Sequence, residues 1–178
     1  MGKLYFVRHG QSQWNVENKI CGATDIPLTD FGREQASLTA DQIINQKIIA
    51  DEILCSPLSR AKETAQIISE KTHIPLREEQ ALFEQNFGHY EGTPRDSQEF
   101  RQAKKNFLCR YGTGESMFQL AQRIYNLLDK IKSEDKTYIL VAHNGIARII
   151  QSYFYEMTND EFADFGIKNC EIKTYVWS

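Results

Sequence analysis

Short apolar runs rich in β-branched and aromatic residues alternate along this chain with longer amphipathic segments. Three of these runs, at residues 4–7, 52–55 and 137–142, are bounded by polar or turn-forming residues and predict buried strands. A fourth, at 171–177, predicts a strand at a sheet edge. Between the runs lie segments with apolar residues at helical spacing, clearest at 115–132. This alternation predicts the α/β class, as a three-layer α/β/α sandwich with a mostly parallel sheet.

Two helices are predicted directly after strands. Ser56 and Pro57 follow the second run, where they would supply an N-cap and a first-turn proline for a helix that carries Arg60. His143 ends the third run, and apolar residues follow it at helical spacing. A further amphipathic helix is predicted over 30–46.

Length and composition predict a single domain over residues 1–178. The formal net charge of −3 gives no electrostatic reason to expect a nucleic acid or an anionic membrane as a partner. No apolar stretch is long enough to span a bilayer. The four cysteines have no CxxC or metal-ligand spacing, which indicates reduced thiols in a cytoplasmic protein. None of these features indicates an oligomeric state.

A polar, irregular segment at 93–114 is predicted to form a short helical excursion that covers the mouth of the site. Its basic residues include Arg95, Arg101, Lys104, Lys105 and Arg110. Because Asp96 and Glu99 lie among them, the cluster is interpreted as a solvated face in preference to a binding patch. Substrate specificity is expected to reside in residues 85–115.

Cationic and imidazole side chains recur where the predicted strands end. Arg8 and His9 follow the first strand. Arg60 stands near the start of the helix after the second strand, and His143 follows the third. In an open α/β sheet, ligands bind in the crevice at the carboxyl ends of the strands. If these strands are parallel neighbours, the four side chains converge on one edge and form a phosphate site.

These residues belong to longer motifs that occur in one order along the chain. The motifs are RHGQSQWN at 8–15, GATDIPLT at 22–29, SPLSRA at 56–61, Glu84 followed by Phe87-Gly88 and Glu91-Gly92, GES at 114–116, and VAHNG at 141–145. Together they resemble the histidine phosphatase superfamily, also called the phosphoglycerate mutase-like superfamily. The resemblance covers nearly the whole chain and implies the phosphoglycerate mutase-like fold and a small phosphorylated substrate. No P-loop or Asp-rich metal motif is present, so neither a metal nor a cofactor is expected.

Phosphoryl chemistry assigns the catalytic roles to two residues. His9 is expected to attack phosphorus through Nε2 and to form a phosphohistidine, with its Nδ1–H held by a backbone carbonyl. Two neighbouring guanidinium groups are expected to keep this imidazole neutral. Glu84 is expected to protonate the leaving oxygen and then to activate water, with Glu91 as the next candidate for this role.

The remaining candidate residues are expected to bind phosphate or substrate. Cationic side chains must do here what Mg²⁺ does in other phosphoryl-transfer enzymes. This role falls to Arg8, Arg60 and His143. The resemblance implies additional hydrogen bonds from Asn15 and from backbone near Gly22 and Asn144.

The predicted function is a metal-independent phosphomonoesterase that hydrolyses a small phosphorylated metabolite. The chain is similar to the short phosphatase branch, which includes α-ribazole phosphatase and broad-specificity phosphatases. A cofactor-dependent phosphoglycerate mutase is the alternative, because WNVEN at 14–18 resembles the mutase pattern. Against it, Glu84 is followed by QNFG at 85–88 in place of the mutase residues Arg-His-Tyr-Gly, and the long mutase insertion is missing. A non-catalytic module that binds a phosphorylated ligand is the second alternative.

Overall fold

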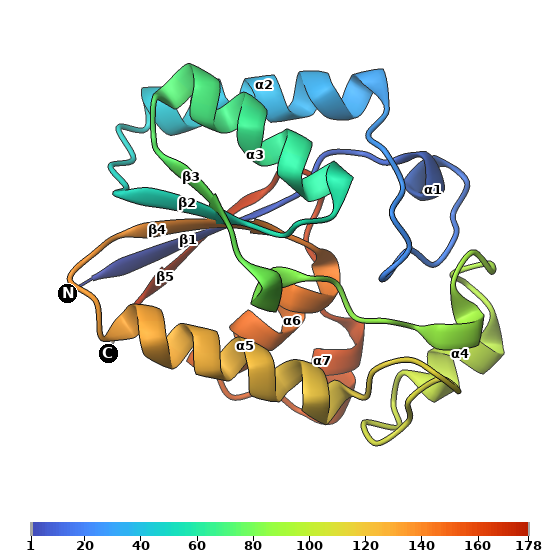
Figure 1. The fold of residues 1–178 in the computed structure, drawn as a ribbon. Helices are drawn as coiled ribbons and strands as arrows, with labels where there is room; N and C mark the ends of the chain where they lie inside the picture. The colour runs from blue at the N-terminus through green and yellow to red at the C-terminus, as the bar shows by residue number, and fades with distance from the viewer. Residues whose placement is uncertain (1, 178) are drawn as a thin grey trace.

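A five-stranded sheet lies between two layers of helices in the computed structural model of this protein, which describes residues 2–177 (Figure 1). The strands are β1 (Lys3–Arg8), β2 (Glu52–Cys55), β3 (Leu76–Glu78), β4 (Tyr138–Ala142) and β5 (Ile172–Val176). Their order across the sheet is β3-β2-β4-β1-β5, and β5 alone among them runs antiparallel to its neighbour. The predicted three-layer sandwich with a mostly parallel sheet is confirmed.

Helices cover both faces of the sheet. They are α1 (Gln13–Val16), α2 (Asp30–Asn45), α3 (Ser59–Thr72), α4 (Gln98–Ala103), α5 (Met117–Lys132), α6 (Asn144–Phe154) and α7 (Asn159–Asp164), with 3-10 turns at Gln80–Leu82 and Gly88–Tyr90. Helices α2 and α3 pack on one face, and α5, α6 and α7 lie on the other (Figure 1). Strand β1 serves both layers because its side chains alternate: Leu4 and Phe6 face α5 and α6, whereas Tyr5 and Val7 face α2 and α3.

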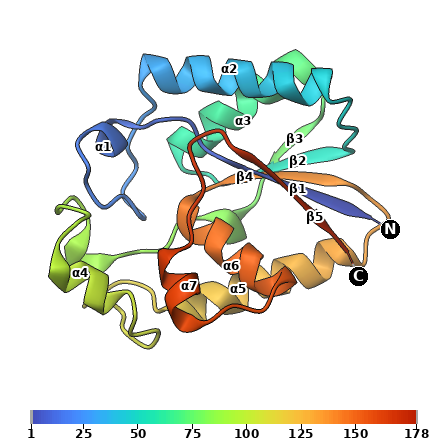
Figure 2. The same ribbon diagram turned by 180° about the vertical axis from the view of Figure 1, so that it is seen from behind.

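The strands that carry the candidate residues are neighbours, as the site prediction requires. Arg8 pairs with Ala142 across the parallel β1–β4 ladder, and Cys55 pairs with Val141 across β2–β4. Just past these pairs, the His9 amide donates to the Ala142 carbonyl at 2.9 Å. Figure 2 shows α1 and α4 at this same end of the sheet, opposite the chain termini. The carboxyl ends of β1, β2 and β4 therefore meet at one place.

Segment 88–114 lies at this end with a small aromatic core of its own. Phe87, Tyr90 and Phe100 pack around Tyr111 and the N-terminal loop residue Ile20. Helix α4 lies inside this segment, so residues 93–114 contain a short helix, and their role as a cover of the site stays a prediction. Of the helices within residues 2–177, none is long and apolar enough to cross a membrane.

The start of α3 differs from its prediction. The helix begins at Ser59 with Leu58 at the N-cap, so Ser56 is not its capping residue. The Ser56 hydroxyl instead lies 2.7 Å from Nε2 of His143. Three residues, 56–58, connect the end of β2 to the start of α3. The Ser56 side chain therefore lies before the helix and forms a tertiary contact with His143.

Three short elements, α1, β3 and α7, were not predicted. Strand β3 covers three residues, of which Arg77 and Glu78 are exposed, so it shows no apolar run. Helix α7 buries Phe162 and Ala163 and is fixed by a capping box between Thr158 and Glu161. Helix α5 likewise starts after a capping box, at Met117, two residues later than expected.

Candidate active site

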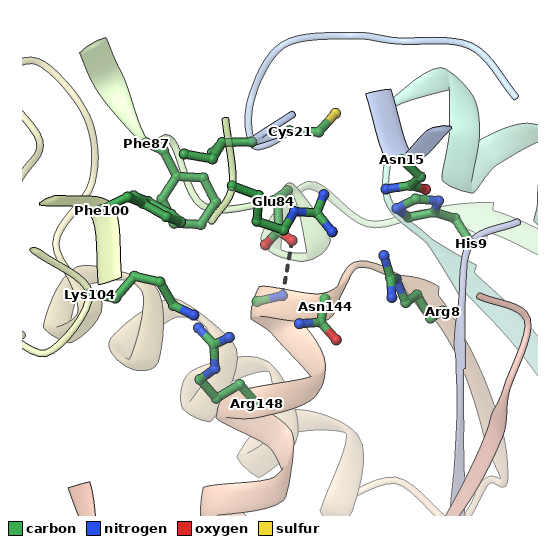
Figure 3. A pocket seen from close by; sticks show the side chains of 13 residues that line it. Arg8, His9, Asn15, Cys21, Glu84, Phe87, Phe100, Lys104, Asn144 and Arg148 are labelled. Carbon is green, nitrogen blue, oxygen red and sulfur yellow. Dashed lines mark hydrogen bonds between the residues drawn. The ribbon is translucent and has the colours of Figure 1, made fainter. Parts of the chain in front are cut away.

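A pocket opens where β1, the end of β4 and segment 88–104 meet. Of the eight candidate residues, Arg8, His9, Asn15, Glu84 and Asn144 line it. The other three, which are Gly22, Arg60 and His143, are buried beside the pocket without lining it. Figure 3 shows His9, Arg8 and Asn15 at one end of the pocket, Lys104 and Arg148 at the other, and Glu84 between them.

His9 directly follows β1, where its amide donates to the Ala142 carbonyl, and the residue is only 4% exposed. Its Nδ1 lies 2.7 Å from the Gly10 carbonyl oxygen. Because a carbonyl oxygen only accepts, Nδ1 must carry the proton, which leaves Nε2 as the unprotonated nitrogen. Burial, then the charges of Arg60 and Arg8, hold the pKa of His9 well below its usual value. The expected carbonyl contact is present, and the pKa is lowered in the direction expected from the arginines, although burial contributes more than either of them.

The guanidinium groups of Arg8 and Arg60 are held by backbone carbonyls, and neither forms a salt bridge with the part of the chain that the structure describes. Arg8 donates from Nη1 to Ile167 at 2.6 Å. Arg60 donates from Nη1 to Thr24 at 2.9 Å and from Nη2 to Gly22 at 2.7 Å. Burial and the nearby Arg95 lower the pKa of Arg8 to about 10. The Nε atoms of both arginines are buried without a hydrogen-bond partner in residues 2–177, an arrangement that favours an anionic ligand.

His143 follows β4 and is completely buried. Its ring centroid lies 5.1 Å from that of His9, and its Nε2 pairs with the Ser56 hydroxyl. Its Nδ1 has no hydrogen-bond partner within the described residues. Burial, followed by the charge of Arg60, lowers the pKa of this imidazole well below its usual value. His143 is therefore a neutral group next to the nucleophile candidate, with one ring nitrogen still to be satisfied.

Glu84 is the carboxylic acid that lines the pocket. Its Oε1 accepts from the Gln85 amide at 2.8 Å, and its Oε2 accepts from the Gly145 amide at the start of α6 at 2.9 Å (Figure 3). Burial raises the pKa of Glu84, while these two N–H groups and Arg60 oppose the rise. A raised pKa keeps a carboxyl group available as a proton donor nearer to neutral pH.

The two asparagines each offer an amide nitrogen. Asn15 Oδ1 accepts from the Ser12 amide at 3.0 Å and from Asn169 at 3.2 Å. Asn144 Oδ1 accepts from the Ile167 amide at 3.0 Å. With both oxygens occupied, each Nδ2 remains as a donor at the pocket. Asn169 was missed in the sequence because it belongs to no strand-end motif.

The backbone amide of Gly22 is already used. It donates to Glu91 Oε2 at 3.1 Å, and the same carboxylate accepts from the amides of Ala23, Thr24 and Phe87 and from the Thr24 hydroxyl. Glu91 does not line the pocket. It is thus an anchor for loop 22–24, which corrects its ranking as the next candidate acid.

Three pocket cations lie outside the candidate set. Arg95 and Lys104 come from segment 93–114 and line the pocket. The interpretation of the basic cluster as a solvated face is wrong for Lys104, which is half-buried, whereas Arg95 both lines the pocket and is exposed. The interpretation holds for Arg101 and Lys105, which are exposed and lie outside the pocket. Arg148 comes from α6, and its position four residues after Asn144 is the signal that places both on one helix face.

Within residues 2–177, no three His, Cys, Asp or Glu side chains are grouped in a way that could hold a metal ion. The absence of a metal from the reaction remains a prediction. The site instead concentrates side-chain cations around a neutral imidazole, in a protein whose net charge is negative. Such a site can bind a phosphoryl dianion and place it against a nitrogen nucleophile.

Comparison with known proteins defines the class to which this fold and site belong. The sequence profile of the histidine phosphatase superfamily (branch 1) matches residues 4–178. The chain belongs to this superfamily, as its motifs predicted.

Some of the proteins that are similar to the chain are named phosphatases, and others are named phosphoglycerate mutases. The chain is 34% identical over 147 residues to the uncharacterized phosphatase PhoE of Bacillus subtilis (strain 168). This alignment covers 82% of this chain and 73% of the relative. The chain is 37% identical over 182 residues to the probable phosphoglycerate mutase GpmB of Yersinia pestis (strain Pestoides F). This alignment covers 97% of this chain and 83% of the relative. Among solved structures, a mutant phosphoserine phosphatase from Entamoeba histolytica in complex with phosphoserine matches with a TM-score of 0.84 at 30% identity, covering 100% of this chain and 92% of that chain.

Proposed function

We propose that this protein is a metal-independent phosphomonoesterase that acts on a small phosphorylated metabolite through a phosphohistidine at His9. The observation that carries the proposal is the fixed tautomer of His9. Its Nδ1–H is bound to the Gly10 carbonyl, so the lone pair of Nε2 is available next to buried guanidinium groups. The relatives named as phosphatases support the same activity.

In the first step, Nε2 of His9 forms a bond to phosphorus while the bond from phosphorus to the leaving oxygen breaks. Arg8 and Arg60 compensate the charge on the phosphoryl oxygens, and Asn15 adds a hydrogen bond. Glu84 gives its proton to the leaving oxygen. In the second step, the Glu84 carboxylate takes a proton from water, whose oxygen bonds to phosphorus and releases His9 and phosphate.

Two features near Glu84 support hydrolysis over return transfer in this proposal. Besides the pocket, Glu84 borders a second, open depression together with Asn86, Glu115 and Arg123, although the residue itself is only 4% exposed. Segment 93–114 is also short, and a mutase must shield its phosphohistidine from water to pass the group back to substrate.

The distinction between phosphatase and mutase is directly measurable. When the enzyme is incubated with 3-phosphoglycerate and catalytic 2,3-bisphosphoglycerate, we expect free phosphate and little 2-phosphoglycerate. The reason is that water reaches the phosphoenzyme before a second substrate oxygen does. Phosphate release and isomerisation are followed in the same sample. Rapid isomerisation without phosphate release would show that the chain is a mutase, as the name of its Yersinia relative suggests.

Removal of divalent metals should leave the activity unchanged. Side-chain cations surround His9, so p-nitrophenyl phosphate should be hydrolysed at the same rate before and after treatment with EDTA. Activity that is lost in EDTA and returns with Mg²⁺ or Zn²⁺ would contradict the proposed chemistry. A complete lack of hydrolysis in every condition, with phosphate still bound, would favour the non-catalytic binding module.

A further inference from the structure

The loop that leads into β5 contacts much of the candidate active site. Loop 165–170 lies between α7 and β5 and forms hydrogen bonds with residues that line the pocket. These pocket residues are Arg8, His9, Asn15, Asn144 and Arg148. Towards Arg8, Asn144 and Arg148 the loop uses backbone groups. Asn169 instead contributes its side chain.

The Asn169 side chain donates to two pocket residues at once. Its Nδ2 lies 2.8 Å from the His9 carbonyl oxygen and 3.2 Å from Asn15 Oδ1. Because a carbonyl oxygen only accepts, the amide nitrogen of Asn169 must be the atom that faces both partners. The two N–H bonds of one amide group thus match two acceptors on separate segments of the site.

The turn that carries Asn169 is fixed by its surroundings. The next residue, Cys170, has a φ of 60°, which non-glycine residues rarely adopt. The Cys170 amide donates to the Arg8 carbonyl at 2.9 Å, and the Cys170 carbonyl accepts from the Thr39 hydroxyl of α2 at 3.1 Å. Such a backbone conformation persists only where neighbouring groups determine it, so the place of the Asn169 amide is set by the fold.

The orientation of Asn15 decides whether it can bind an anion. An asparagine side chain keeps almost the same shape when its oxygen and nitrogen are exchanged. The Asn15 oxygen accepts from the Ser12 amide at 3.0 Å as well as from Asn169. Exchange of the two atoms would place the Asn15 NH₂ group against two donors and would turn its oxygen toward the ligand. Ser12 and Asn169 therefore both favour the orientation that leaves Nδ2 for an anion, next to the His9 ring (Figure 3).

We propose that Asn169 is a positioning residue, which holds Asn15 with its Nδ2 directed at the phosphoryl oxygens. This inference rests on the proposed function, since it takes the phosphoryl group to be at His9. Asn169 does not line the pocket and acts on the ligand through Asn15. A donor whose orientation is already set stabilises the developing charge without being reordered during the reaction.

A double-mutant cycle with Asn15 tests this role. Binding of inorganic phosphate is measured by calorimetry, and kcat/KM for p-nitrophenyl phosphate by steady-state kinetics, on the wild type, both single variants and the double variant. We expect Asn15→Ala to weaken phosphate binding about tenfold and Asn169→Ala about fivefold. In the Asn15→Ala background, Asn169→Ala should change the affinity less than about twofold, because the side chain that it positions is gone.

Three outcomes of the cycle would overturn the proposal. An equally large effect of Asn169→Ala in the Asn15→Ala background would mean that Asn169 acts through the His9 carbonyl. Unchanged phosphate binding in the Asn15→Ala protein would mean that Asn15 does not hold the anion. Unchanged binding in the Asn169→Ala protein would mean that Ser12 alone orients Asn15. If the Asn169→Ala protein does not fold, Asn169→Ser takes its place, since serine shortens the donor and should lose the contact with Asn15.

The side-chain amide signals of Asn15 give a readout that a purely structural role would not change. In nitrogen–proton NMR spectra they are assigned by their loss in the Asn15→Ala protein. We expect one sharp pair of signals in the phosphate-free wild type, and broadened or doubled signals in Asn169→Ala, because the amide then samples two orientations. The same sharp pair in both proteins would contradict the proposal.

Glu171→Ala is the matched control for the loop. Glu171 accepts from the Lys168 amide at 2.8 Å and does not line the pocket. The substitution loosens the loop without touching Asn15, and the loss of a negative charge does not weaken the binding of an anion. The Glu171→Ala protein should therefore bind phosphate at least as tightly as the wild type. A loss as large as that in Asn169→Ala would assign the effect to the order of the loop and overturn the role of Asn169.

The proposed function can fail separately from this inference. Phosphate binding and the Asn15 signals are measured without turnover. If both respond to Asn169→Ala as expected but the wild type does not hydrolyse p-nitrophenyl phosphate, the positioning role stands and the proposed function fails.

Discussion

Substitution of His9 by alanine is expected to lower kcat/KM for p-nitrophenyl phosphate by a factor on the order of 10⁵. The substitution removes the nitrogen that bonds to phosphorus, and no other neutral imidazole lines the pocket within the described residues. Binding of inorganic phosphate should persist, since Arg8 and Arg60 are held by backbone carbonyls and not by His9. Steady-state kinetics and phosphate calorimetry measure the two effects separately.

Chemical trapping tests whether phosphorus becomes bonded to His9. An alkaline, denaturing quench of the wild type with radiolabelled substrate should yield a label on His9 that is stable in base and lost in acid. His89→Ala is the matched control, because His89 is exposed and outside the pocket, and it should keep full activity. Substantial turnover by the His9→Ala protein, or a label on another residue, would rule out the mechanism.

Replacement of Glu84 by glutamine should have an effect that depends on the leaving group. For an alkyl phosphate, phosphoenzyme formation should slow by roughly 10² to 10⁴, because the alkoxide needs a proton as it leaves. For p-nitrophenyl phosphate the loss in this step should be less than about tenfold, because nitrophenolate leaves without one. Rapid-quench measurement isolates this step from the later hydrolysis, in which Glu84 acts as the base.

The pH dependence follows from the raised pKa of Glu84. The acid form is required, so phosphoenzyme formation from an alkyl phosphate should decrease as the pH rises through that pKa. Glutamine has no such titration, and the alkaline decrease should disappear in the variant. Equal losses on both substrates would assign the proton to a different group. Glu91 is not available for this role, since its carboxylate accepts five hydrogen bonds away from the pocket.

Hydrophobic periodicity predicted those elements that bury a continuous apolar face. Strands β1, β2 and β4 are covered on both sides, so their sequences are uninterrupted apolar runs. Strand β3 is short and half-exposed, and its place in the sheet depends on pairing with β2, which no local pattern encodes. The start of α3 was misplaced because the hydroxyl of Ser56 suits an N-cap and a tertiary hydrogen bond equally well.

The same limit separates the predicted from the unpredicted parts of the site. Residues at strand ends could be placed together, because parallel strands fix where their carboxyl ends lie. Lys104 and Lys105 are adjacent in sequence and identical in chemistry, yet one lines the pocket and the other pairs with Asp160 at the surface. Only the packing of α4 on its aromatic neighbours determines which lysine faces inward.

The backbone of loop 22–24 is held by hydrogen bonds to side chains from two different parts of the chain. The Glu91 carboxylate accepts hydrogen bonds from the backbone amides of the loop, and Arg60 donates to the carbonyl oxygens of Gly22 and Thr24. Glu91, loop 22–24 and Arg60 are distant in sequence but are joined by one network of hydrogen bonds. Loss of one member should weaken the positions of the others. Because Glu91 lies in segment 88–114, we expect local opening of that segment to loosen loop 22–24 and, with it, the hydrogen bonds that hold Arg60 beside His9.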